Sequence, residues 1–245
     1  MVIFFPKKSL GQNFLIQPQV ALDMAFSVSN SDLVVEIGPG TGALTKKLLE
    51  KGARVIAVEK DNLLYKRLSE ENVDNLEVIH GDVLETDLFI KEPYKIVANI
   101  PYYITGKIIR HFLETENQPT SMTLLIQKEV AERIVAKDSK ESLLSISVKV
   151  YGNPTYIKTV KRGNFNPIPK VDSAILHIEN ISRDNFKNLD ENLFFKVLKT
   201  GFSSKRKKVS KNLKSLIRIE DPRRPEDLSL KDWLDIVRKM SQQFQ

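Results

Sequence analysis

Short apolar runs and helically spaced apolar positions alternate along the first part of the chain. Residues 17–28 have apolar side chains at helical spacing, which predicts a first helix. The run Leu33–Ile37 is short and rich in β-branched residues, as in a buried strand. A glycine turn at Gly38–Gly42 follows, and then a helix at Ala43–Lys51 and a second strand at Arg54–Val58. This order of elements predicts the opening of a doubly wound α/β sheet.

The same alternation continues to about residue 180 and then stops. We expect further helices at 61–71, 105–115 and 128–136, and strands at 76–79, 95–98, 121–127, 143–151, 155–160 and 173–179. Beyond residue 182 the pattern predicts helices alone, at 190–201, 206–216 and 229–239. The sequence therefore predicts an α/β domain over residues 1–180 and a small helical domain over residues 181–245.

The composition narrows the class of protein. Hydrophobic residues make up 41% of the 245 residues, and no apolar run approaches the roughly 18 residues that span a bilayer. The N-terminus lacks an apolar core followed by a small-residue cleavage site, so we expect a cytoplasmic protein without a signal peptide. The chain has no cysteine and three scattered histidines, which argues against disulfides and against a metal site. The net charge of +7 favours polyanionic partners, although this alone is weak evidence.

The first motif with chemical meaning is Glu36–Gly42, with the sequence EIGPGTG. Glycines after a buried strand, such as Gly38 and Gly40, let the backbone turn tightly and approach a ligand closely. Glu59 ends the next strand, where a carboxylate can accept both hydroxyls of an adenosine ribose. NAD and S-adenosylmethionine both satisfy this geometry, because with Ala43 the run also fits the dinucleotide fingerprint.

Asp82 follows the third strand of the series. Its carboxylate can accept a hydrogen bond from an adenine amino group, although taken alone an aspartate there also fits a helix cap or a turn. Glycine or acidic residues now occupy three successive strand ends, and this coincidence favours a nucleotide-like ligand over isolated structural roles.

The segment Asn99–Tyr102, with the sequence NIPY, follows the fourth strand. The N6 amine of adenine is a poor nucleophile, because its lone pair is delocalised into the ring. The Asn99 side-chain oxygen and the Ile100 carbonyl can hold its hydrogens and favour a more tetrahedral nitrogen. Pro101 restricts the backbone and aims that carbonyl, and the Tyr102 ring can stack on the base. With a sulfonium methyl donor, catalysis then needs mainly alignment and electrostatics.

The chain resembles the ribosomal RNA adenine dimethylases from about residue 7 to 240. Besides the two motifs above, the resemblance rests on the segments Lys8–Leu15 (KSLGQNFL), Gln127–Arg133 (QKEVAER), Phe165–Ser173 (FNPIPKVDS) and Lys205–Lys208 (KRKK). It implies a class I S-adenosylmethionine-dependent methyltransferase domain with a small helical C-terminal domain. It also implies dimethylation of two adjacent adenosines near the 3′ end of small-subunit ribosomal RNA, with a role in subunit biogenesis.

Site residues follow from the resemblance, motif by motif. The implied cofactor-binding residues are Asn13, Leu15, Gly38, Gly40, Glu59, Asp82 and Asn99. The implied catalytic motif is Asn99–Tyr102, and Phe165 is expected to be a second aromatic residue flanking the target base, with a place in the core as the alternative. The family more often has Leu at the position of Ile100, and its C-terminal part is somewhat longer.

A basic segment follows residues 201–204. Its members are expected to begin a helix and to bind RNA phosphates, and they are Lys205, Arg206, Lys207, Lys208, Lys211 and Lys214. Lys7 and Lys8 are expected to extend this surface, and a merely solvated charged face is the alternative. We expect a monomer that binds ribosomal RNA in a precursor of the small subunit, with neither a membrane nor a metal as partner.

Three other functions remain open. An erythromycin-resistance methylase performs the same chemistry on a large-subunit adenine, but Gly11, the segment Gln127–Glu129 and Asp172 favour the small-subunit enzyme. A mainly non-catalytic ribosome-assembly or transcription factor on the same fold is disfavoured by the intact Asn99–Tyr102 motif. An NAD dehydrogenase has no need for that motif at a strand end.

Overall fold

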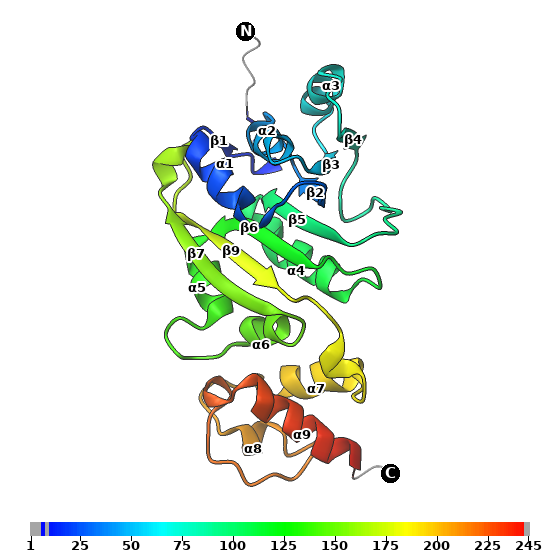
Figure 1. The fold of residues 1–245 in the computed structure, drawn as a ribbon. Helices are drawn as coiled ribbons and strands as arrows, with labels where there is room; N and C mark the ends of the chain where they lie inside the picture. The colour runs from blue at the N-terminus through cyan, green and yellow to red at the C-terminus, as the bar shows by residue number, and fades with distance from the viewer. Residues whose placement is uncertain (1–5, 8–9, 243–245) are drawn as a thin grey trace. The chain divides into compact units, whose positions relative to one another are not determined.

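The computed structural model describes residues 6–7 and 10–242 (Figure 1). The strands are β1 (Phe14–Leu15), β2 (Leu33–Ile37), β3 (Arg54–Glu59), β4 (Leu76–His80), β5 (Tyr94–Asn99), β6 (Ser121–Gln127), β7 (Asn153–Val160), β8 (Phe165–Asn166) and β9 (Ser173–Glu179). The α-helices are α1 (Pro18–Met24), α2 (Ala43–Glu50), α3 (Asn62–Glu70), α4 (Thr105–Glu114), α5 (Lys128–Val135), α6 (Leu143–Lys149), α7 (Glu191–Gly201), α8 (Val209–Asn212) and α9 (Leu230–Gln242). Short 3-10 helices are η2 (Ala25–Ser27), η3 (Tyr102–Ile104), η4 (Arg162–Asn164), η5 (Asp184–Phe186) and η6 (Pro225–Asp227).

Seven strands form one sheet in the order β4-β3-β2-β5-β6-β9-β7. The strands from β4 to β6 are parallel, and β9 runs antiparallel to β6. The chain winds from β2 outward to β4, then restarts at β5 and winds the other way. Because such crossovers are right-handed, the helices of the two halves cover opposite faces. The predicted doubly wound α/β sheet is confirmed.

The reversal of winding fixes where a ligand can bind. Parallel strands present their carboxyl ends at one edge, and a crevice opens where neighbouring strands depart in opposite directions. Here that point lies between β2 and β5, whose ends Ile37 and Ala98 are paired in register. The glycine turn follows one of these strands, and the Asn99–Tyr102 motif begins at the end of the other.

The chain forms two compact units, each with a core of its own. One comprises Met1–Ala131 and Thr155–Ile181, and the other comprises Glu132–Pro154 and Ser182–Gln245. The first unit contains the strand ends described above. In the second, α7 packs on α9, and the buried side chain of Trp233 lies against Phe202, with ring centroids 5.3 Å apart. The predicted domain division at residue 180 stays a prediction. The second unit also includes residues 132–154, which precede that division in the sequence.

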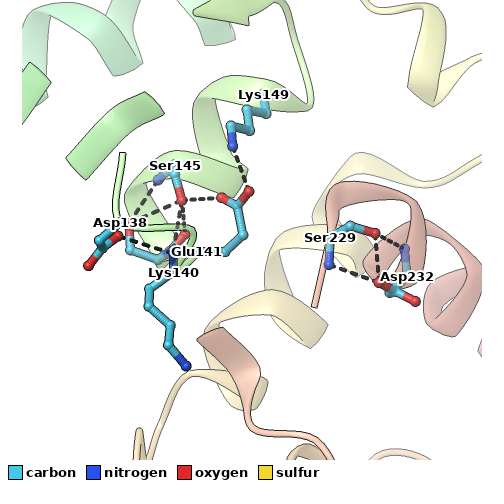
Figure 2. A network of polar contacts seen from close by, with 8 residues as sticks. Asp138, Lys140, Glu141, Ser145, Lys149, Ser229 and Asp232 are labelled. Carbon is cyan, nitrogen blue, oxygen red and sulfur yellow. Dashed lines mark hydrogen bonds and ion pairs between the residues drawn. The ribbon is translucent and has the colours of Figure 1, made fainter. Parts of the chain in front are cut away.

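The predicted strand at 143–151 is wrong, because residues Leu143–Lys149 form the helix α6. Their alternating apolar pattern suits a strand, but the local hydrogen bonds favour a helix. The Ser142 hydroxyl accepts from the Ser145 amide at 3.0 Å, and the Ser145 hydroxyl accepts from the Ser142 amide at 2.7 Å. The Glu141 carboxylate accepts from the Ser145 hydroxyl at 2.6 Å and pairs with Lys149, one helical turn after Ser145, at 2.5 Å (Figure 2). This capping box begins the helix.

The helix predicted at 206–216 is much shorter, since α8 covers only Val209–Asn212. The Asn212 side chain donates to the carbonyls of Gly201 at 2.6 Å and Ser204 at 2.9 Å. These bonds fold the basic segment back toward the end of α7, so that most of it precedes the helix as a turn. By contrast, α9 begins where expected, and Figure 2 shows its cap, in which the Asp232 carboxylate accepts from both the amide and the hydroxyl of Ser229.

Candidate functional site

A cavity of about 350 Å³ lies at the carboxyl edge of the parallel strands, within the first compact unit. It brings together every predicted cofactor-binding residue and the whole NIPY motif. These residues are Asn13, Leu15, Gly38, Gly40, Glu59, Asp82, Asn99, Ile100, Pro101 and Tyr102. Side chains that lie up to 89 positions apart in sequence, from residue 13 to residue 102, thus share one space. The predicted roles of these residues stay predictions.

The glycine turn supplies bare backbone to the cavity wall. Gly38 has a φ of +65°, which L side chains rarely adopt, and a Cβ there would meet no atom within 4 Å. Gly40 has a φ of +60°, and a Cβ there would come within 3.1 Å of the Phe14 ring. A ligand can therefore approach the backbone at Gly38, while Gly40 lets the turn lie against Phe14 of β1.

Glu59 is buried at the end of β3, where its two oxygens hold separate parts of the chain. One oxygen accepts from the Gly40 amide at 3.0 Å, and the other accepts from the Asp61 amide at 2.7 Å. Burial raises the pKa of Glu59 above its ordinary value. A carboxylate offers about four lone-pair sites, so acceptor capacity remains for two ligand hydroxyls.

Asp82 lies at the cavity wall and also stabilises the loop that follows β4. One carboxylate oxygen accepts from the Leu84 amide at 3.0 Å, and the other lies 2.7 Å from the Lys60 ammonium. The Lys60 ammonium holds the pKa of Asp82 below its ordinary value, so this carboxylate is an ionised acceptor at neutral pH. The turn-forming role and the ligand-binding role considered for Asp82 are compatible.

Asn99 is held by a residue from the N-terminal segment. Its side-chain amide nitrogen donates to the Asn13 carbonyl at 3.1 Å, and the Asn13 amide nitrogen donates to the Gly11 carbonyl at 3.2 Å. With its nitrogen so engaged, Asn99 presents its oxygen as an acceptor at the cavity. Pro101 has φ −55° and ψ 130°, which gives the motif an extended step before η3 begins at Tyr102.

The two predicted aromatic residues have different surroundings. Tyr102 lines the cavity, and its hydroxyl lies 2.7 Å from the buried hydroxyl of Ser173 on β9. Burial raises the pKa of the Tyr102 hydroxyl, and the negative charge of Asp172 acts in the same direction. Phe165 is 1% exposed and packs in the hydrophobic core with Leu15. It does not line the cavity, so this arrangement supports the core alternative, and its stacking role stays an untested prediction.

The structure adds residues that the sequence did not indicate. Phe14 and the 62% exposed Tyr103 line the cavity, as does Gln12. Gln12 donates to the Asp61 carboxylate at 3.2 Å, so it links the N-terminal segment to the cap of α3. Gln12 and Phe14 belong to the motif KSLGQNFL, in which only Asn13 and Leu15 were predicted to bind the cofactor. The length of this motif was a signal that further residues within it would line the site.

The predicted RNA-binding residues divide into three groups. Lys7 lies in the first unit and is partly engaged, with its ammonium 3.0 Å from the Asp61 carboxylate. Lys8 lies outside the described residues. The remaining predicted residues are exposed and lie in the second unit, and they are Lys205, Arg206, Lys207, Lys208, Lys211 and Lys214.

No group of three or more histidine, aspartate or glutamate side chains at 6–7 and 10–242 is arranged to hold a metal ion. None of the helices described there is long and apolar enough to cross a membrane.

Glu36, at the end of β2, is a buried carboxyl group in the cavity wall. It is 1% exposed, and its Oε2 has no hydrogen-bond partner among the described residues. Burial raises the pKa of Glu36 to about 8, and the negative charge of Glu59 adds to the increase. The cavity wall therefore includes a buried carboxyl group with one unpaired acceptor.

This raised pKa predicts a pH-dependent stability. The ordinary pKa is 4.5, and the folded value is about 8, so the folded state binds the proton more tightly. The stability from this proton is present below pH 4.5 and is lost as the pH rises to 8, by at most roughly 1.4 kcal/mol per pH unit. Urea unfolding of Glu36→Gln should show a smaller decrease between pH 5 and pH 8 than the unsubstituted protein. Exposed Glu77→Gln is the control, and equal decreases in all three proteins would contradict the burial of a neutral Glu36.

Comparisons with known proteins identify the family of this chain. The model of the ribosomal RNA adenine dimethylase family matches residues 4–240. The ribosomal RNA small subunit methyltransferase A of Dehalococcoides mccartyi (strain CBDB1) is 40% identical over 249 residues, which cover 93% of this chain and 86% of that protein. The protein of the same name from Fusobacterium nucleatum subsp. nucleatum is 39% identical over 259 residues, with coverage of 96% and 97%.

Two solved structures share the fold. A dimethyladenosine transferase from Plasmodium falciparum superposes with a TM-score of 0.82 at 28% identity and covers 94% of this chain and 98% of its own. The 23S rRNA methyltransferase ErmE superposes with a TM-score of 0.78 at 24% identity, with coverage of 94% and 100%, which shows a common fold alone. With its family model matched over almost its whole length and its site motifs assembled in one cavity, the chain belongs to the ribosomal RNA adenine dimethylases, on a methyltransferase fold.

Proposed function

We propose that this protein transfers methyl groups from S-adenosylmethionine to the N6 atoms of two adjacent adenosines near the 3′ end of small-subunit ribosomal RNA. The observation that carries the proposal is the single cavity shared by the ribose-type acceptor Glu59 and the Asn99–Tyr102 motif. The protein would act in the cytoplasm as a monomer on a precursor of the small subunit. Homology to enzymes named for that subunit supports this substrate.

The residues at the cavity fit the cofactor. Glu59 has acceptor capacity for the ribose hydroxyls, Asp82 for the adenine amine, and Gly38 leaves room for close approach of the ligand. The ionised Asp82 carboxylate favours a ligand with positive charge, and the unpaired Glu36 oxygen favours a ligand that donates a hydrogen bond. S-adenosylmethionine carries a sulfonium and an ammonium, whereas NAD would bring a pyrophosphate to the same acidic wall. The charge of the cavity therefore supports the methyl donor over the dinucleotide.

The chain's own residues would align the nucleophile. The cofactor supplies a methyl group on a positively charged sulfur. The Asn99 oxygen and the Ile100 carbonyl would accept the two hydrogens of the adenine amine, and the Tyr102 ring would stack on the base. The methyl carbon would pass to the nitrogen as the sulfur leaves as a neutral thioether, and the nitrogen would lose one proton to solvent. A second round gives the dimethylated base.

The named relatives support the small subunit as the target. Two proteins at 39–40% identity are named for the small subunit, whereas the large-subunit enzyme ErmE, at 24% identity, supports the fold alone. The exposed basic turn that includes Lys205–Lys208 supports RNA as the partner through phosphate contacts. Extrusion of the target base from paired or stacked RNA would bring it to the cavity.

The proposed function predicts a specific pattern of methylation. The protein, incubated with labelled S-adenosylmethionine and unmethylated ribosomal subunits, should label small-subunit RNA at two adjacent adenosines near its 3′ end. Mapping of the modified nucleotides checks this directly. Label confined to the large-subunit RNA would instead establish the rival methylase activity, and an absence of label from both subunits would contradict the enzyme.

We expect the hydrogen bond between the Tyr102 and Ser173 hydroxyls to position the Tyr102 ring for stacking on the base. Tyr102→Ala should slow single-turnover transfer by the loss of base stacking, which is worth about 1–3 kcal/mol. Tyr102→Phe keeps the ring but loses one hydrogen bond, so it should cost only about 0.5–1.5 kcal/mol in transition-state stabilisation. Ser173→Ala should match it, and the double variant should be no slower than either single variant. Cofactor affinity, measured by calorimetry, should stay unchanged throughout.

A different ranking would contradict this account of Tyr102. If Tyr102→Phe were as damaging as Tyr102→Ala, the hydroxyl would take part in the chemistry. If the losses from Tyr102→Phe and Ser173→Ala simply added, the bond between the two hydroxyls would not be what positions the ring.

A further inference from the structure

The connection between β7 and β9 forms a basic hollow on the surface of the first unit. Its lining residues are Lys161, Arg162, Lys170 and Asp172. All three cationic side chains are exposed. The hollow therefore gathers three positive charges around one carboxylate, apart from the basic turn of the second unit.

The carboxylate in the hollow is already engaged. One Asp172 oxygen accepts from the Arg162 backbone amide at 3.0 Å, and the other lies 3.0 Å from the Lys161 ammonium. The Arg162 guanidinium reaches the Lys170 carbonyl at 3.5 Å, which places Arg162 beside Lys170. No carboxylate within the described ranges lies at ion-pair distance from either of these two side chains. Two neighbouring cations thus remain available to an external anion.

The hollow is fixed to the wall of the methyl-transfer cavity. Asp172 directly precedes Ser173, whose hydroxyl contacts Tyr102. In the middle of the connection, Asn166 of β8 pairs with Phe14 of β1, and Phe14 lines the cavity. The basic connection is therefore attached in its middle and at its C-terminal end to residues that shape the site for the target base.

We propose that Arg162 and Lys170 bind a backbone phosphate of the RNA strand beside the target adenosine. This inference rests on the proposed function. An adenine stacked on Tyr102 brings its own sugar-phosphate backbone to the cavity mouth, where a guanidinium and an ammonium suit a phosphate anion. The exposed apolar side chains of Ile168 (67%) and Val171 (38%) flank Lys170 and can cover the adjoining sugar. The pair positions the extruded nucleotide, while the basic turn of the second unit contributes general affinity.

The test compares matched charge losses at opposite edges of the sheet. Arg162→Gln/Lys170→Gln removes two charges from the proposed clamp. Lys66→Gln/Lys91→Gln removes two exposed charges, one on α3, which packs on the far edge strand β4, and one in the loop that follows β4. Binding of an RNA hairpin with two adjacent unpaired adenosines is measured over a series of KCl concentrations. Single-turnover methylation of unmethylated small subunits and calorimetry with S-adenosylmethionine complete the comparison.

The clamp variant should lose affinity for the hairpin about tenfold, and the slope of log K against log salt should decrease by about 0.7 for each lost single-strand phosphate contact. Its methylation rate should fall while its cofactor affinity equals that of the unsubstituted protein. The control variant should keep both the slope and the rate. Equal behaviour of the clamp and control variants, with methylation intact, would overturn the clamp alone. Failure of the unsubstituted protein to methylate RNA would instead overturn the proposed function.

Discussion

The site depends on the buried carboxylate of Glu59. Through one oxygen it holds the glycine turn at Gly40, and through the other it holds the amide of Asp61 at the start of α3. Asp61 in turn caps that helix and accepts from Gln12 of the N-terminal segment. The glycine turn, the start of α3 and the N-terminal segment are therefore joined through the neighbouring carboxylates of Glu59 and Asp61. A buried charge is tolerated only where such donors surround it.

Charge is distributed unequally between the cavity and the surface of this protein. The cavity wall has the carboxylates of Glu59 and Asp82, whereas exposed lysines and arginines give the chain a net charge of +7. An acidic cavity suits a cationic methyl donor, and a basic exterior suits a polyanionic RNA. Electrostatics can thus direct the methyl donor to the cavity and the RNA to the surface before any specific hydrogen bond forms. Only the target base then has to enter the cavity from the surface.

Much of this arrangement could be predicted from the sequence, because it depends on local periodicity. The buried runs of β2 and β6 were predicted with their observed bounds, and parallel strands necessarily bring the following residues, such as Glu59 and Asn99, to one edge. The family resemblance supplied the roles proposed for those residues. All the residues predicted to bind the cofactor line the same cavity.

The remaining features depend on contacts that periodicity does not encode. The α6 segment alternates like a strand, and only the reciprocal bonds between Ser142 and Ser145 favour a helix. The short α8 follows from the Asn212 bonds to carbonyls 8 and 11 positions earlier. Phe165 is buried because β8 pairs with β1, a two-stranded contact between segments about 150 residues apart in sequence, which no local pattern reveals.

The central claim is that the Asn99 oxygen aligns the adenine amine for methyl transfer. Single-turnover methylation by Asn99→Ala, at S-adenosylmethionine concentrations that calorimetry shows to be saturating, tests it most directly. The account predicts a loss of rate of about 100-fold or more, as for removal of one preorganised hydrogen-bonding group, with an unchanged circular dichroism spectrum. Transfer by Asn99→Ala at the rate of the unsubstituted protein would contradict it.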